Sequence, residues 1–187
     1  MDPIRAGRCP LDPAQPTLYR ADVERCAECG FEYDLDEAPA AAAAIVDGVG
    51  ELAATLSDRG AEVRVRRDPQ TWSPLEYGCH VRDVLLVQRE RVLAARRMDR
   101  PSFDPMGRDE RVEHDGYAEQ HAGDVARQLT DAAHLFANDL SRLAPHDWDR
   151  TVMYNYPTRF ERSLRWVAVH TVHEVRHHLL DVHGQLA

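Results

Sequence analysis

The stretch RSLRWVAVHTVHEVRHHLLDVH, residues 162–183, decides the fold prediction because it has the pattern of one long helix. It contains no Gly or Pro that would interrupt a helix, and five of the ten histidines of the chain fall within it. Such a density of metal-capable side chains on one predicted helix indicates a metal site. The alternative interpretation, a solvated polar face, explains two histidines better than it explains five with an acid among them.

Seven apolar residues between 164 and 186 share one helical face when residues are placed about 100° apart. They are Leu164, Ala168, Val172, Val175, Leu179, Val182 and Leu186. Glu174 and His178, an i,i+4 pair, lie at the edge of that face, and metal sites in bundles use side chains that project inward. His173 and His177 point almost the opposite way. The spacing therefore favours Glu174 and His178 as ligands, and the other two histidines are the alternative pair.

The composition indicates a single soluble domain. A chain of 187 residues is long enough for one domain with a proper core, and leaves room for a small appended module. Hydrophobic residues make up 43%, with no apolar run long enough to span a bilayer and no segment typical of a signal peptide. We therefore expect a cytoplasmic protein without a membrane partner. The formal net charge of -9 argues against nucleic-acid binding, which needs clustered positive charge.

Residues 1–36 show little helical periodicity and are predicted to form an irregular N-terminal arm. The arm contains three of the four cysteines, Cys9, Cys26 and Cys29, and the last two form a Cys-x-x-Cys motif followed by Gly30. Such a motif can form a knuckle that points both sulfurs at one zinc ion. We expect these three thiolates to hold a structural zinc, with Cys79, a histidine or water as the fourth ligand. Free thiols or a redox pair are the alternatives.

Residues 37–187 are predicted to form an all-α four-helix bundle. Helical spacing and capping residues place the helices at about 39–57, 74–98, 117–143 and 159–183. The second helix has the clearest start, because Ser73 is placed as N-cap, Pro74 at the first helical position and Glu76 to complete a capping box. Residues 99–116 form a long connection, and 144–158 a polar, aromatic loop. This arrangement lets the second and fourth helices face each other.

His80 lies on the inward stripe of the second helix, about a turn and a half from its start. A lone histidine there is usually a core residue. With Glu174 and His178, however, it would complete a set of two histidines and one carboxylate that leaves metal positions open. Zinc would accept this set, and iron, nickel and manganese are also compatible. The candidates to orient these ligands through hydrogen bonds are Asp83, Asp181 and His177.

These residues resemble the DinB-like superfamily, which includes mycothiol-dependent maleylpyruvate isomerase and bacillithiol S-transferases. The resemblance covers most of the chain after residue 36, and rests on WSPLE at 72–76 before His80 and on EVRHHLLD at 174–181. It implies a metal held by one histidine of the second helix and by two residues of the fourth helix that have three residues between them. In the family, a Gln or Asp commonly follows the second member of the pair by three residues, as Asp181 follows His178. The resemblance therefore also selects Glu174 and His178.

The sequence departs from the family pattern in two ways. Members whose fourth helix supplies two histidines would select His173 and His177 instead. The Cys-x-x-Cys arm lies outside the general pattern and looks like an extension found in some actinobacterial relatives.

The resemblance implies that a metal activates a low-molecular-weight thiol such as mycothiol, whose thiolate then attacks a small electrophile in S-transfer or isomerisation. The substrate site would be lined by Tyr154, Tyr156 and Arg165, with Trp148, Arg159 and Arg162 as further candidates. We accordingly expect a divalent metal, zinc first, a thiol cosubstrate and a small-molecule substrate, and leave a homodimer open. The alternatives are a metal-dependent hydrolase and a non-catalytic metal-binding stress protein.

Overall fold

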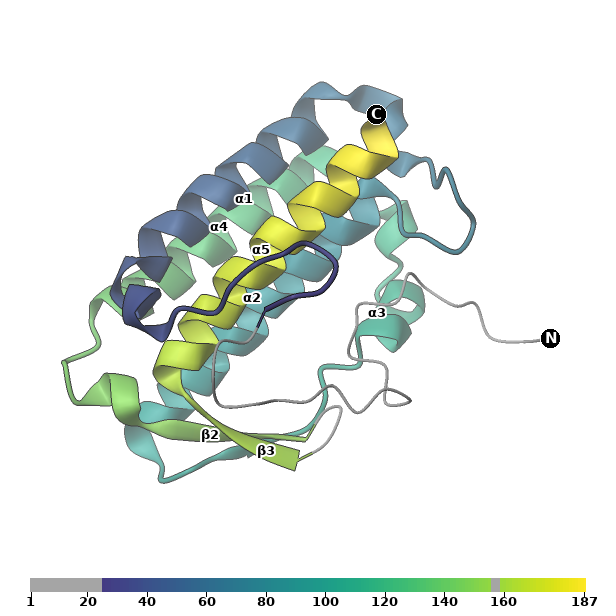
Figure 1. Ribbon diagram of the computed structural model, residues 1–187. Helices are drawn as coiled ribbons and strands as arrows, with labels where there is room; N and C mark the ends of the chain where they lie inside the picture. The colour runs from purple at the N-terminus through teal and green to yellow at the C-terminus, as the bar shows by residue number, and fades with distance from the viewer. Residues whose placement is uncertain (1–24, 156–158) are drawn as a thin grey trace.

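Four long helices form the body of the protein in a computed structural model that describes residues 25–155 and 159–187 (Figure 1). They are α1 (Ala41–Asp58), α2 (Pro74–Arg97), α4 (Ala122–Ser141) and α5 (Leu164–Leu186). Both α1 and α2 pack along α4 and α5, which places α1 and α2 on a diagonal of the bundle. The predicted four-helix bundle is confirmed, and α2 lies directly beside α5.

The capping box predicted at the start of α2 is present. Ser73 has an extended backbone, its Oγ accepts from the Glu76 N–H at 3.3 Å, and its own N–H donates to Glu76 Oε2 at 2.8 Å. Arg66 forms an ion pair with the same carboxylate. Because these bonds satisfy the free donors of the first turn, the helix begins at Pro74 and carries His80 in its second turn.

The fourth bundle helix begins later than predicted. Ser163 is its N-cap, with its hydroxyl accepting from the Trp166 N–H at 3.3 Å, so α5 starts at Leu164. The preceding residues, Arg159–Ser163, form strand β3 and pair antiparallel with strand β2, Thr151–Asn155. The prediction of a helix from 159 was wrong here, because the chain before the cap is extended and is hydrogen-bonded to β2.

The predominantly helical fold is confirmed, and a small sheet is added to it. A third strand, β1 (Ser102–Phe103), pairs parallel with β2, giving a three-stranded sheet β1-β2-β3 at one end of the bundle (Figure 1). The long connection also contains the helix α3 (Arg108–His114). Shorter 3-10 turns occupy Leu35–Ala40, Gly60–Arg64, Tyr117–Glu119 and Asp147–Asp149.

The third bundle helix begins at Ala122 instead of Tyr117 because the chain turns twice before it. Gly116 has a positive φ of 56°, and Tyr117 starts a 3-10 turn. The Tyr117 ring is fully buried, and its hydroxyl donates to Asp83 of α2 at 2.7 Å. This anchor holds residues 117–119 against α2 and leaves α4 to start at Ala122.

The segment Leu35–Asp58 is long and apolar enough to cross a membrane by length and composition alone, although no such run was expected. One such helix is weak evidence, because core helices of soluble proteins pass the same test. Its residues Ile45, Val49, Leu52 and Leu56 are buried in the bundle core.

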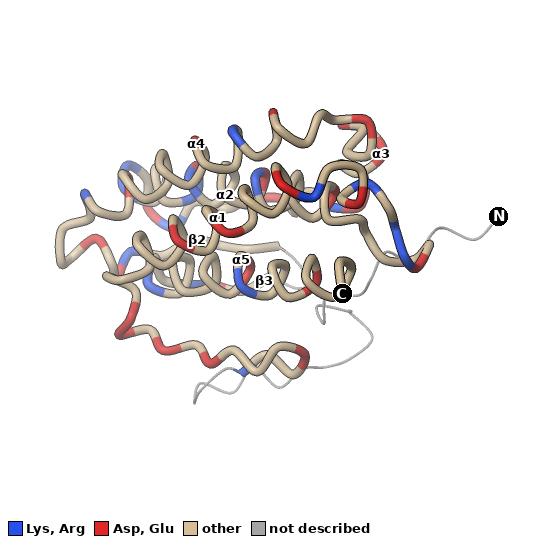
Figure 2. The backbone as a smooth tube through the Cα atoms, turned by 90° about the horizontal axis from the view of Figure 1, so that it is seen from above, with Lys and Arg blue, Asp and Glu red and all other residues tan. Residues whose placement is uncertain are grey.

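The described part of the N-terminal arm lies across α5 (Figure 1). It leads into α1 through Leu35–Ala40, which also contacts α5. Because the arm lies across α5, it brings the Cys-x-x-Cys motif to the helix that carries the histidines. Figure 2 shows that the arm and the turn before α1 carry several acidic positions, whereas acidic and basic positions are interspersed along the helices.

Candidate metal centre

Helices α2 and α5 bring His80, Glu174 and His178 together, and we call these three residues the bundle centre. Oε2 of Glu174 lies 3.6 Å from Nε2 of His178 and 3.9 Å from Nε2 of His80. Two nitrogen or oxygen atoms bound tetrahedrally to one zinc ion lie about 3.3 Å apart. All three side chains are buried. The spacing and chemistry of this donor set fit a divalent metal after a small adjustment of the side chains.

Neighbouring side chains fix the orientation of the two imidazoles. Nδ1 of His178 lies 2.9 Å from Oδ2 of Asp181, so an Nδ1–H donated to this carboxylate leaves Nε2 free to bind a metal. The His80 ring packs against Trp72 with ring centroids 5.2 Å apart, and it meets His178 edge to face at 4.9 Å. Asp181 thus occupies the orienting position that the sequence suggested.

The bundle centre keeps its carboxylate ionised. Burial alone would raise the pKa of Glu174, but His173, His178 and His80 lower it well below its usual value. Burial likewise would lower the pKa of His178, but Asp181 and Glu174 raise it to about 9. Burial lowers the pKa of His80. A carboxylate that lies among imidazoles is an environment that would also bind a metal cation.

A second group of metal-capable side chains lies on the adjacent positions of α5. Cys26 and Cys29 come together with His173 and His177, and their ligand atoms all lie within 4.8 Å of one another. We call these four residues the knuckle cluster. The alternative histidine pair therefore faces the cysteines, and in the described part of the chain it forms no cluster with His80.

Cys79, a candidate for the fourth ligand of the predicted zinc site, does not join this cluster. Cys79 is buried in the bundle core, with its thiol 3.6 Å from Gln120 Oε1, and burial raises its pKa to about 12. Cys9 lies outside the described residues.

Glu174 lies between the two groups. Its Oε2 faces the bundle centre, while its Oε1 lies 3.5 Å from Nδ1 of His173 and 3.7 Å from Nε2 of His170. The Tyr33 hydroxyl lies 2.9 Å from Nδ1 of both histidines. The arm thus contributes a polar group next to the bundle centre, which sequence patterns could not show because the arm has no helical register.

The predicted substrate residues lie in different places. Tyr154 is buried, donates to Gln88 at 2.8 Å and stacks on Phe160. Arg165 forms an ion pair with Asp149, 3.1 Å away. Tyr156 lies outside the described residues. Asp83 accepts from Tyr117 and pairs with two arginines, so it anchors the connection instead of orienting the metal ligands.

Arg91 of α2 was missed by the sequence reasoning because arginines on helices are usually solvated. Its guanidinium is buried, stacks 4.2 Å from the centroid of Tyr154 and donates to Gln88 at 3.0 Å. Its Nε has no hydrogen-bond partner, and no carboxylate pairs with it among the described residues. Burial is the main cause that lowers the pKa of the nearby His170 imidazole, and the positive charge of Arg91 lowers it further.

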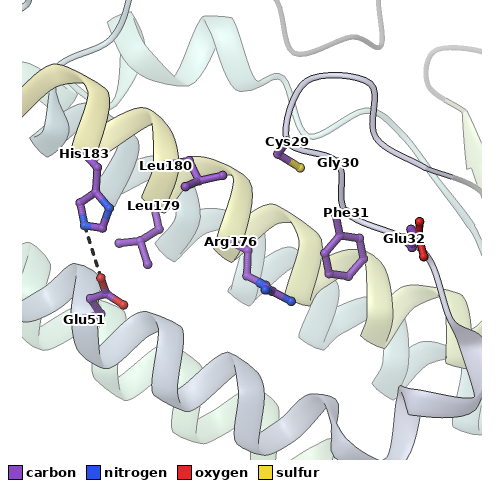
Figure 3. Close-up of a pocket in the computed structure, with 9 residues that line it drawn as sticks. All are labelled: Cys29, Gly30, Phe31, Glu32, Glu51, Arg176, Leu179, Leu180 and His183. Carbon is purple, nitrogen blue, oxygen red and sulfur yellow. Dashed lines mark ion pairs between the residues drawn. The ribbon is translucent and has the colours of Figure 1, made fainter.

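A pocket of about 590 Å³ opens between the arm residues 29–32 and the C-terminal half of α5 (Figure 3). Phe31, Arg176 and Leu180 line it, and Glu51 of α1 pairs with His183 at its edge, 3.3 Å apart. None of the three residues of the bundle centre lines this pocket. We therefore do not assign the substrate site to it.

Comparison with known proteins identifies the class of this bundle. The sequence profile of the DinB superfamily matches residues 34–182, and the chain belongs to that superfamily. Among solved structures, YfiT from Bacillus subtilis matches with a TM-score of 0.67 and 13% identity, covering 77% of this chain and 85% of YfiT. YfiT is described as a probable metal-dependent hydrolase with an unusual four-helix bundle topology. No curated protein matches the chain by sequence.

Proposed function

We propose that this DinB-superfamily protein is a metal-dependent enzyme that activates a low-molecular-weight thiol, such as mycothiol, for S-transfer or isomerisation at a small electrophile. The observation that carries the proposal is the bundle centre, where three metal-capable side chains of the described residues, His80, Glu174 and His178, converge from two helices. Three protein ligands leave positions for water or substrate, as in catalytic zinc sites. Zinc is the first candidate, and nickel, iron or manganese would fit the same donors.

A divalent ion held there would lower the pKa of a thiol or water in an open position, so that the nucleophile forms near neutral pH. The protein residues hold and shield this centre. Asp181 keeps His178 in one tautomer and ring orientation. Trp72 and Tyr77 pack against the two imidazoles and exclude water from their back faces. Such exclusion strengthens the electrostatic effect of a bound cation.

Arg91 and Tyr154 support an electrophile that carries an anionic group. A buried guanidinium without a carboxylate partner is costly, and an incoming carboxylate would compensate it with charge-assisted hydrogen bonds. The ring of Tyr154 holds the guanidinium in place from one side. An aromatic chain from Tyr154 through Trp166 to His170, with centroid separations of 5.4 and 4.3 Å, leads from this arginine toward the bundle centre. Its last ring, His170, lies 3.7 Å through Nε2 from Oε1 of Glu174.

A second candidate function is metal-dependent hydrolysis, with water in place of the thiol. The structural likeness to YfiT, which is described as a probable metal-dependent hydrolase, favours it. The same three ligands would serve both reactions. A metal-binding protein without turnover is the third candidate, and it would need the bundle centre to bind metal without an effect on any reaction.

The test is a side-by-side assay of metal-loaded protein with two probes. One probe is mycothiol with an aryl halide that reports thioether formation, and the other is a chromogenic ester in the absence of thiol. We expect metal- and thiol-dependent turnover that is lost in the His80→Ala variant. Ester turnover without thiol would favour the hydrolase, whereas no metal-dependent turnover with either probe would favour the non-catalytic protein.

A further inference from the structure

We propose that Cys26, Cys29, His173 and His177 bind a zinc ion in a closed, four-ligand site that fastens the N-terminal arm to α5. This zinc is separate from the metal of the bundle centre, and the inference does not depend on the reaction catalysed there. One histidine takes the place that Cys9 had in the sequence-based prediction, and the other fills the fourth position, for which a histidine was one of the candidates. Two cysteines and two histidines are a complete ligand set for a structural zinc ion.

The backbone around the cysteines forms a knuckle. Residues Arg25 and Glu32 form an antiparallel bridge, Cys26 N–H donates to the Phe31 carbonyl at 2.8 Å, and Gly30 N–H donates to the Cys26 carbonyl at 2.9 Å. Gly30 has a positive φ of 72°, which closes the turn and favours glycine at this position. The tight turn places both sulfurs on one side, toward α5.

The imidazoles are arranged so that one nitrogen of each ring is held and the other faces the thiols. Nε2 of His177 lies 3.3 Å from Oε2 of Glu28, while its Nδ1 lies 3.8 Å from Sγ of Cys26. Sulfur and nitrogen atoms bound tetrahedrally to one zinc ion lie about 3.6 Å apart. Donation of the second ring N–H to a carboxylate is typical of zinc-bound histidine.

His173 shows the same division. Its Nδ1 lies 2.9 Å from the Tyr33 hydroxyl. Its Nε2 is buried and has no hydrogen-bond partner within normal distance among the described residues, and His173 as a whole is only 5% exposed. A buried unpaired nitrogen is costly, and coordination to zinc would satisfy it.

The knuckle and α5 are also joined outside the proposed ligands. Phe31 packs against the His173 ring with centroids 5.3 Å apart, and the guanidinium of Arg176 lies over the Phe31 ring, 5.6 Å from its centroid. Figure 3 shows Cys29, Gly30 and Phe31 running beside α5 at this point. The zinc would thereby hold the Tyr33 hydroxyl in its position between His170 and His173.

Zinc counting on the full chain tests the inference. Protein saturated with zinc and desalted should contain two ions per chain in the wild type and one in the Cys26→Ser/Cys29→Ser variant. The matched control Cys9→Ser should keep two. An unchanged zinc content in the double variant would overturn the proposal, and loss of one ion in Cys9→Ser would return Cys9 to the ligand set.

Two readouts keep the test valid if the double variant folds poorly. In cobalt-loaded wild-type protein we expect a thiolate-to-metal charge-transfer band, which persists in His80→Ala and disappears in His177→Ala. In unmodified wild-type protein, zinc should protect Cys26 and Cys29 from a thiol reagent, as located by peptide mass spectrometry. A cobalt protein without the band, or equal modification of both cysteines with and without zinc, would refute the site.

Discussion

The bundle centre and the knuckle cluster use neighbouring residues of the same helix for different chemistry. Glu174 and His178 face α2, where His80 makes a group of three candidate ligands, a number that would leave positions open on a metal. His173 and His177, each one residue earlier, face the arm, where two cysteines make a group of four candidate ligands. A shift of one residue turns a helix by about 100°. A single histidine-rich helix can therefore serve an open centre on one face and a closed one on the other.

The largest expected effect separates the two adjacent histidines by activity. His178→Ala removes a ligand of the bundle centre and should lower kcat/KM for thiol-dependent turnover at least ~100-fold, because removing even an outer-shell partner of a metal ligand costs about 10–100-fold. His177→Ala should retain at least roughly a tenth of the wild-type kcat/KM. Equal losses in the two variants would show that the helix does not divide the centres as described.

The next effect concerns the orientation of His178. In Asp181→Asn the carboxylate that accepts from Nδ1 is lost, so we expect metal affinity at the bundle centre to fall about 10–100-fold. The matched control is Asp83→Asn, which weakens the anchor of Tyr117 and should lower the thermal midpoint without changing metal affinity. Competition with a chelator of known affinity measures both. Identical affinities for Asp181→Asn and wild type would remove Asp181 from the site.

Arg91 tests whether the bundle centre takes an anionic substrate. Arg91→Met retains the length and apolar contacts of the side chain but loses its charge, so KM for a carboxylate-bearing electrophile should rise about tenfold with little change in kcat. Arg165→Met, which removes an ion pair with Asp149, should leave KM unchanged. The opposite result would favour Arg165, the arginine that the sequence predicted.

The smallest effect should come from the hydroxyl that lies between the two groups. Tyr33→Phe keeps the ring contacts with Trp166 and His173 but removes contacts of 2.9 Å with two imidazoles. We expect a loss of about 1 kcal/mol in the free energy of unfolding and a change in turnover below roughly threefold. Denaturant unfolding and steady-state kinetics measure these. A loss of turnover as large as that in His178→Ala would place Tyr33 in the reaction itself.

Much of the bundle follows from local sequence signals. The capping residues Ser73 and Glu76 predict the start of α2 to the residue, and the helical phase of α5 separates Glu174 and His178 from the other histidine pair. Both signals are local, since capping and amphipathic spacing act within one or two turns.

The remaining features depend on contacts between distant parts of the chain. Strands β2 and β3 replace the predicted loop and helix start because each is extended only in the presence of its partner. The histidine ligands in the knuckle cluster could not be identified because Cys26 is 151 residues from His177, and the arm has no periodicity to fix its direction. Arg91 was missed because its burial depends on β2 packing over α2.

In the proposed arrangement His177 and His178 belong to separate metal centres. The most direct measurement is the number of zinc ions per chain in wild type, His177→Ala, His178→Ala and the double variant, after saturation and passage over a chelating resin. With two separate centres we expect two ions in the wild type, one in each single variant and none in the double variant. A wild type that binds a single ion, lost in both single variants alike, would contradict this arrangement.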